Sequence, residues 1–136
     1  MDTITVEHHA ILGLGSNIAD GDKILDKAIA KMMTDGVAIP SERSDTYKTP
    51  PLSGEGEYYF NGVAAVTTVL DLYRLKQYFK GLEKAFGRDK LKSPEKVPLD
   101  IDIVIYDDKV TRPKDYEREY FLIGFRQLNS VPSKAD

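Results

Sequence analysis

The chain has 136 residues, 41% hydrophobic and 30% charged, a balance that predicts one folded domain over residues 1–136 with a short C-terminal tail at 126–136. Lysine and arginine number 19 against 22 aspartates and glutamates, so the net charge is −3 and no general basic field exists that would attract nucleic acid. The absence of cysteine excludes disulfides and thiolate zinc sites, and without a membrane-spanning apolar run or signal-peptide pattern a cytoplasmic protein is expected.

The first half of the chain predicts a strand, a helix and an extended segment. Residues 10–15 form an apolar run of the length of a buried strand, and a Gly-Ser-Asn turn signal follows. A helix is expected to start at Asp20, a favourable N-cap, and to stop at residues 35–36. Its apolar positions recur at helical spacing and are Leu25, Ala28, Ile29 and Met32. Residues 37–49 are expected to be extended.

The second half predicts two strands, a helix and two loops. Residues 49–57 contain two prolines and two glycines and are expected to be a loop, whereas residues 58–68 are rich in aromatic and β-branched residues and predict a strand. A second helix is expected after the cap Asp71, with one continuous apolar face formed by Leu72, Leu75, Phe79, Leu82 and Phe86. The polar residues 88–98 predict a loop, and residues 99–106 predict the last strand.

The order of these elements predicts the fold class. Strand, helix, strand, strand, helix, strand is the arrangement of a ferredoxin-like α+β sandwich, βαββαβ, with an antiparallel-containing sheet and helices on one face. A doubly wound parallel fold is disfavoured because only a loop separates the two middle strands. Residues 109–136 contribute one apolar patch, at 120–125, and an otherwise polar end.

The most informative segment is Leu-Asp-Ile-Asp-Ile-Val-Ile at residues 99–105. Side chains alternate along a strand, so one face is expected to hold the apolar residues Leu99, Ile101, Ile103 and Ile105. Asp100 and Asp102 are expected on the other face, which Val104 and Tyr106 would share. Two adjacent carboxylates repel unless a cation lies between them, and carboxylates together with phosphate oxygens are typical Mg²⁺ ligands. The alternative is a solvated outer face of an edge strand.

A local excess of basic residues precedes the two aspartates. Residues 80–96 contain six cations and three anions inside an acidic protein, a composition suited to neutralising a polyphosphate. The alternative is that some of these cations are present because a helix C-terminus favours positive charge.

An aromatic residue and an amide are predicted to lie side by side on an earlier strand. Tyr59 and Asn61 share one face if residues 58–68 form a strand, so an aromatic plane would stand beside a group able to hydrogen-bond the edge of a flat heterocycle. The alternative is that these aromatic residues only fill the core.

Several short motifs follow one another in the order seen in a known family. They are Leu14-Gly15-Ser16-Asn17, Tyr47-x-Thr49-Pro50-Pro51, Tyr59-Phe60-Asn61, Leu82-Glu83-x-x-x-Gly87-Arg88 and Leu99-Asp100-Ile101-Asp102. Near the end, Arg112-Pro113 and Arg118-x-Tyr120 fall where that family has His-Pro and Arg-x-Phe. The chain resembles the 6-hydroxymethyl-7,8-dihydropterin pyrophosphokinase family of folate biosynthesis from about residue 11 to residue 122.

This resemblance implies a Mg²⁺-dependent transfer of a diphosphate from ATP, as co-substrate, to the hydroxymethyl group of the pterin, with release of AMP. It implies that Asp100 and Asp102 bind two magnesium ions, and that Arg88 belongs with them to the catalytic set. The residues implied for pterin binding are Thr49, Pro50, Tyr59, Asn61 and Tyr120. Those implied for ATP binding are Glu83, Arg88, Lys90, Arg112 and Arg118. The expected partners are therefore two small molecules, pterin and ATP.

Four positions depart from the family pattern. Lys90 and Val97 stand where the family has arginines, Arg112 replaces a histidine, and Tyr120 replaces a phenylalanine. Lysine keeps the charge but not the two-pronged geometry of arginine, and arginine cannot act as a neutral donor or acceptor as histidine can. A degenerate paralogue that binds pterin or nucleotide without efficient transfer is therefore one alternative to an enzyme, and a small interaction protein is another.

Overall fold

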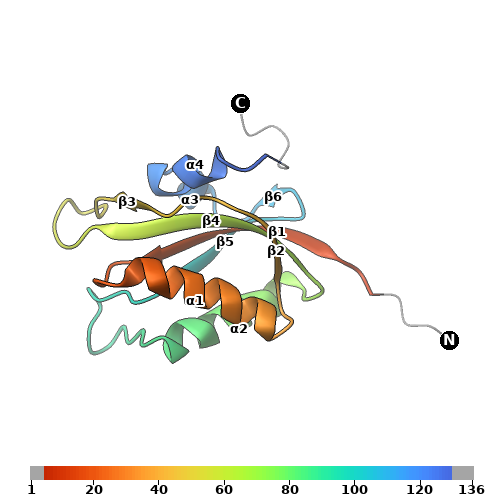
Figure 1. Cartoon of the computed structure of the whole chain (residues 1–136), viewed down its shortest axis with the longest axis horizontal. Helices are drawn as coiled ribbons and strands as arrows, with labels where there is room; N and C mark the ends of the chain where they lie inside the picture. Colours follow the sequence, from red (N-terminus) through yellow and green to blue (C-terminus); the bar gives the residue numbers. More distant parts are fainter. Residues whose placement is uncertain (1–4, 130–136) are drawn as a thin grey trace.

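One antiparallel sheet of six strands forms the centre of the computed structural model, which describes residues 5–129 (Figure 1). The strands are β1 (His8–Ser16), β2 (Ile39–Arg43), β3 (Tyr47–Thr49), β4 (Tyr59–Thr68), β5 (Asp100–Tyr106) and β6 (Lys109–Val110). The helices are α1 (Gly21–Thr34), α2 (Leu72–Ala85), α3 (Pro113–Tyr116) and α4 (Glu119–Phe125). The predicted α+β, ferredoxin-like fold class is confirmed.

The strand order in the sheet is β2-β4-β1-β5-β6, and every neighbouring pair is antiparallel. The predicted extended segment at 37–49 is divided into two short strands, β2 and β3. Both pair with β4, β3 near its start and β2 nearer its end. The central strand β1 therefore lies between β4 and β5, which carry the aromatic-amide pair and the two aspartates. No helix among residues 5–129 combines the length and the apolar character that crossing a membrane requires.

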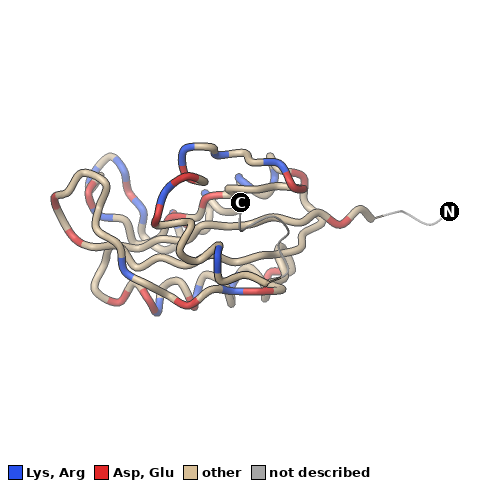
Figure 2. Tube along the Cα trace, turned by 90° about the horizontal axis from the view of Figure 1, so that it is seen from above, with Lys and Arg blue, Asp and Glu red and all other residues tan. Residues whose placement is uncertain are grey.

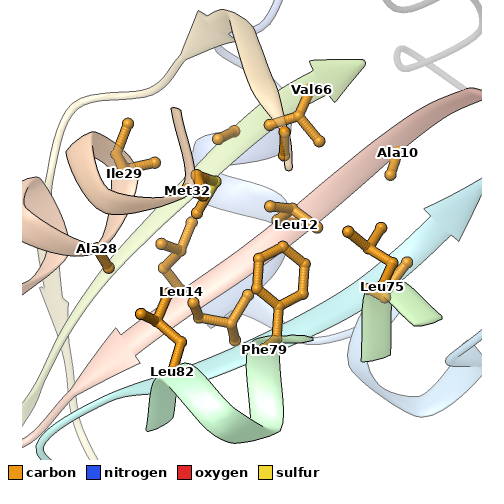
Figure 3. Close-up of a cluster of buried hydrophobic side chains, with 14 of the residues drawn as sticks. Ala10, Leu12, Leu14, Ala28, Ile29, Met32, Val66, Leu75, Phe79 and Leu82 are labelled. Carbon is orange, nitrogen blue, oxygen red and sulfur yellow. The ribbon is translucent and has the colours of Figure 1, made fainter. Parts of the chain in front are cut away.

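The first face of the sheet is closed by α1 and α2, which lie together on one side in Figure 1. All four apolar positions predicted for the first helix are buried, and so are Leu75, Phe79 and Leu82 of the second. Figure 3 shows these side chains meeting Leu12 and Leu14 of β1. This burial of apolar surface is the main force holding the helices to the sheet.

The ends of the two helices follow the predicted punctuation with one exception. The Asp71 side chain accepts a hydrogen bond from the Arg74 backbone N–H at 2.8 Å and so caps α2. Gly87 follows α2 with φ of 105°, a conformation that residues with a Cβ rarely adopt. Asp20 stands at the N-cap position of α1, but its side chain makes no capping hydrogen bond.

The second face is covered by the C-terminal segment, whereas the prediction placed helices on one face only. α4 packs on β4, and its Phe121 and Phe125 form a second apolar cluster with residues of β1, β4 and β5. Gly124 allows this close approach, because a Cβ there would lie 2.7 Å from Val63 Cγ2. The predicted tail at 126–136 begins inside this layer, since Leu128 is buried in the same cluster. Residues 130–136 lie outside the described residues.

A β-bulge in β5 changes which side chains share a face. The pairing of β5 with β1 shifts by one residue between Ile11 and Leu12, which leaves Val104 of β5 without a partner, so alternation is interrupted there. Ile103 belongs to the first core, but Ile105 packs against the second, and Tyr106 returns to the first. The prediction that Ile105 shares a face with Ile103 is wrong, and so is the prediction that Tyr106 shares a face with the aspartates. Both errors come from assuming an unbroken strand.

Candidate active site

Seven of the residues implied for binding line one cavity of about 400 Å³ on the second face of the sheet. These seven are Thr49, Pro50, Tyr59, Asp100, Asp102, Arg112 and Tyr120. The rest of the lining is Gly15, Pro51, Leu52, Ser53 and Asp115. The cavity is therefore enclosed by the end of β1, the start of β5, the loop after β3, and the segment containing α3 and α4.

The register of three strands brings the polar residues of the cavity together. Gly15 of β1 pairs with Asn61 of β4 on one side and with Asp100 of β5 on the other. A Cβ at position 15 would lie 3.6 Å from both Asn61 Oδ1 and Tyr59 Cδ2. The glycine thus leaves the floor open between the aromatic-amide pair and the carboxylates, which are about 40 residues apart in the sequence.

The negative charge of Asp100 opposes the ionisation of its neighbour Asp102. Burial, and next the negative charge of Asp100, raises the pKa of Asp102 to about 8, while the nearby Arg112 acts in the opposite direction. Arg112 Nε lies 3.6 Å from Asp102 Oδ1. A cation placed between the carboxylates would relieve this repulsion, so the donor set fits a divalent ion.

A metal at these carboxylates would need further ligands from a substrate. Among residues 5–129, no group of three or more histidine, aspartate or glutamate side chains is arranged to hold a metal ion. Two carboxylates leave most of the coordination positions of Mg²⁺ open, and phosphate oxygens and water commonly fill them. The site is therefore suited to a metal that arrives with a polyphosphate.

Glu83 contacts the strand that carries the aspartates. Its Oε2 accepts a hydrogen bond of 2.8 Å from the backbone N–H of Ile101, the residue between Asp100 and Asp102. Burial is the main cause of the raised pKa of Glu83, and this hydrogen bond opposes it. The contact joins α2 to β5 where the two carboxylates emerge. Glu83 does not line the cavity, and its expected role at the nucleoside end of ATP stays a prediction.

The aromatic-amide pair predicted from the sequence is part of a local hydrogen-bond network. Asn61 Nδ2 donates to Thr49 Oγ1 at 2.6 Å and to the backbone carbonyl of Tyr59 at 3.2 Å. Asn61 and Thr49 are both buried, so this network holds the amide in one orientation at the edge of the cavity. The Tyr59 ring lines the cavity itself, and partial burial is the main cause of its raised pKa.

A carboxylate that the sequence analysis did not single out joins the other wall of the cavity. Asp115 Oδ2 accepts a hydrogen bond from Arg112 Nε, and Asp115 Oδ1 accepts one from the Tyr120 hydroxyl. Arg112 thereby lies between two carboxylates, Asp115 and Asp102. The i, i+3 spacing of Arg112 and Asp115 after a turn was the available signal, because such pairs meet within a short helix.

The remaining residues implied for ATP binding lie outside this cavity. Arg88 Nη1 donates to three backbone carbonyls of the loop that follows it, those of Ser93, Pro94 and Lys96, at 2.8–3.4 Å. Lys90 and Arg118 are exposed. Figure 2 shows basic and acidic residues interspersed along the tube.

The loop at residues 88–98 is held to the turn after β1. Asn17 donates to the Glu95 carbonyl at 2.8 Å and accepts from the Val97 backbone N–H at 2.7 Å. Val97 is only 6% exposed, so the side chain that replaces a family arginine points inward, whereas Leu91 near the middle of the loop is 97% exposed. A second cavity, of about 420 Å³, lies between this loop and residues 51–57 and shares Pro51, Ser53 and Tyr59 with the first.

Comparison with known proteins identifies the family. The family model described as 7,8-dihydro-6-hydroxymethylpterin-pyrophosphokinase (HPPK) matches residues 11–130. The chain belongs to this family. The resemblance inferred from the short motifs is therefore confirmed, and the HPPK match extends eight residues beyond residue 122, into the segment that forms the second face.

Three bacterial relatives of the HPPK family are named 2-amino-4-hydroxy-6-hydroxymethyldihydropteridine pyrophosphokinase. The protein of Methylorubrum extorquens is 30% identical over 118 residues, which cover 81% of this chain and 74% of the relative. The protein of Bacillus subtilis is 26% identical over 128 residues, covering 88% of this chain and 77% of the relative. The protein of Synechocystis is 31% identical over 131 residues, covering 89% and 66%.

A solved structure supports the HPPK fold. The crystal structure of Plasmodium falciparum HPPK-DHPS with pteroate has a TM-score of 0.50 to this chain at 16% sequence identity. The match covers 76% of this chain and 28% of that longer chain. At this identity the similarity concerns the fold alone.

Proposed function

We propose that this chain transfers the diphosphate of ATP to the hydroxymethyl group of 6-hydroxymethyl-7,8-dihydropterin and releases AMP. The observation that carries the proposal is one cavity lined both by the Asp100–Asp102 pair and by aromatic residues, with the Asn61 amide hydrogen-bonded to Thr49 of its lining. Such a transfer needs one subsite for the metal and the phosphates and another for the flat pterin ring. Membership of the HPPK family supports the same reaction.

The pterin would occupy the end of the cavity lined by Tyr59 and Tyr120, beside the buried Asn61. The two aromatic rings would stack on the faces of the heterocycle, and the Asn61 amide would hydrogen-bond its edge. Thr49 already accepts a hydrogen bond from Asn61, so it would orient that amide, and Pro50 would close the pocket beside it.

The phosphates would occupy the carboxylate end. Asp100 and Asp102 would hold magnesium, two ions by the family pattern, which when bound neutralises phosphate charge and aligns the reacting groups. Arg112 at the cavity would contact the transferred diphosphate. We further propose that Arg88, Lys90 and Arg118 supply cations around the rest of the nucleotide, with Glu83 near the ribose.

A second candidate function is binding of pterin or nucleotide without efficient transfer. Two observations favour it: Val97 points inward where the family has an arginine, and Arg112 is paired with two carboxylates where the family has a histidine. These changes affect the phosphate end, whereas at the pterin end only Tyr120 departs from the family pattern and it keeps an aromatic ring.

A coupled assay of AMP release decides between the two candidates. The wild-type protein with ATP, Mg²⁺ and 6-hydroxymethyl-7,8-dihydropterin should release AMP only when all three are present. A control is Asp107→Asn, because this exposed aspartate follows the far end of β5, away from Asp100 and Asp102, and should leave turnover unchanged. Calorimetric binding of pterin without any AMP release would instead support the non-catalytic function, and absence of both would overturn the proposal.

A further inference from the structure

Two departures from the family pattern meet at a single carboxylate. Arg112 and Tyr120 both hydrogen-bond to Asp115, one to each oxygen. The Asp115 side chain is only 14% exposed and lines the same cavity as the metal-binding pair. None of the implied roles in the family pattern belongs to this residue.

A third carboxylate at this position needs compensation. Asp100 and Asp102 already repel each other, and Asp115 adds to the negative charge around Asp102. A buried carboxylate without a partner is costly, but Asp115 has a guanidinium and a phenol hydroxyl as partners, which satisfy both of its oxygens. The charge of Asp115 is therefore balanced by its partners in the wall of the cavity, and Asp115 does not provide a further metal ligand.

The Arg112 side chain needs something to hold it. It is 47% exposed and has several rotatable bonds, so in isolation it would sample many positions. Its contact with Asp102 is loose, at 3.6 Å, whereas its hydrogen bond with Asp115 is direct. Because Asp115 binds Arg112 independently of Asp102, the guanidinium can stay at the cavity when Asp102 engages another cation.

We propose that Asp115 is a positioning residue that acts through Arg112, holding its guanidinium beside the Asp100–Asp102 pair and linking it to the Tyr120 wall. This inference rests on the proposed diphosphate transfer for its effect on turnover, although the contact itself does not. The Tyr120 hydroxyl completes the arrangement, since a phenylalanine at that position could not donate to Asp115. Arg112 then meets the diphosphate preorganised, at a smaller cost in side-chain entropy.

A double-mutant cycle tests this role through turnover. Asp115→Asn should lower kcat/KM for MgATP about tenfold, the loss typical of a mispositioned contact group, and should change kcat/KM for the pterin less. In an Arg112→Ala background the same Asp115→Asn change should alter kcat/KM by less than about twofold, because the residue it acts through is absent. Glu117→Gln, an exposed carboxylate nearby, is the matched control and should behave as wild type. Full multiplication of the two single effects, or an Asp115→Asn variant indistinguishable from wild type, would overturn the proposal.

A second measurement does not depend on activity. In the ligand-free protein, ¹⁵N NMR should give Arg112 a shifted, exchange-protected Nε–H signal in wild type and in Glu117→Gln, and lose it in Asp115→Asn. Arg112→Lys keeps the positive charge but has no Nε–H, so it should show the same kcat/KM as Asp115→Asn. It provides the test if Asp115→Asn folds poorly. If wild type shows the protected signal but releases no AMP, the proposed function is wrong and the Arg112–Asp115 hydrogen bond is still supported. If wild type lacks the signal, the positioning role fails.

Discussion

The two faces of the sheet are built from the same strands but are closed in different ways. The first face is covered by two helices of 14 residues each, and a large cluster of buried apolar side chains fills the space between helices and sheet (Figures 1 and 3). The second face is covered by two short helices and the residues after them, with a smaller apolar cluster and, beside it, the polar cavity. The difference teaches that one face supplies most of the stability, and the partly covered face leaves room for buried charge.

The largest expected effect is a loss of stability when an apolar side chain of the first face is removed. Phe79→Ala removes a buried ring from the first face and should lower the free energy of unfolding by about 3–5 kcal/mol, measured by urea denaturation. The folded variant should keep its kcat/KM. Phe121→Ala on the second face should destabilise no more than that, yet should lower kcat/KM, since its neighbour Tyr120 lines the cavity. Equal loss of activity in both variants would contradict a division of roles between the faces.

The next effect concerns the carboxylate pair. Asp100→Ala should lower the rate of AMP release by roughly 10²–10³-fold, as for loss of a principal electrostatic group, and should abolish Mg²⁺-dependent ATP binding. The fold should survive because removing one carboxylate relieves the repulsion on Asp102 in the metal-free protein. Calorimetry with MgATP measures binding, and circular dichroism checks the fold. Binding of MgATP as tight as that of wild type would place the metal site elsewhere.

A smaller effect is expected at the pterin end. Asn61→Ala should cost about 1–3 kcal/mol of pterin affinity, the range for leaving a buried polar partner unpaired. Because Asn61 also donates to Thr49, a Thr49→Val variant is the matched test of whether the loss arises from pterin contact or from amide orientation. Unchanged pterin affinity of Asn61→Ala by calorimetry would remove this residue from the pocket.

The smallest effect is the dependence of stability on pH that Asp102 on the second face should cause. The pKa of Asp102 is about 8 in the folded protein and about 4 when unfolded, so between these values the folded state binds more protons and stability falls as pH rises. Asp102→Asn in a metal chelator should therefore be more stable than wild type by about 1–2 kcal/mol near pH 8.5, with the gain fading toward pH 5. A difference in the free energy of unfolding that is constant with pH would show that Asp102 is not strained by its neighbours.

Local sequence patterns determined most of the secondary structure and half of the site. Helical spacing of apolar residues located α1 and α2, and the Asp71 cap and Gly87 marked the ends of α2. Alternation placed Asp100 and Asp102 together on one face of β5. These features depend on residues within one or two turns or along one strand, so the sequence contains all the information they require.

Tertiary structure decided the features that depend on contacts between distant segments. The bulge at Val104 arises from pairing with β1, and it moved Ile105 and Tyr106 to the faces opposite those predicted. The second layer formed because the C-terminal helix α4 packs on β4. A helix of seven residues is too short for its apolar periodicity to predict this packing. Asp115 lies close in sequence to Arg112 and Tyr120, but only the tertiary structure brings this local cluster against Asp102 and the cavity.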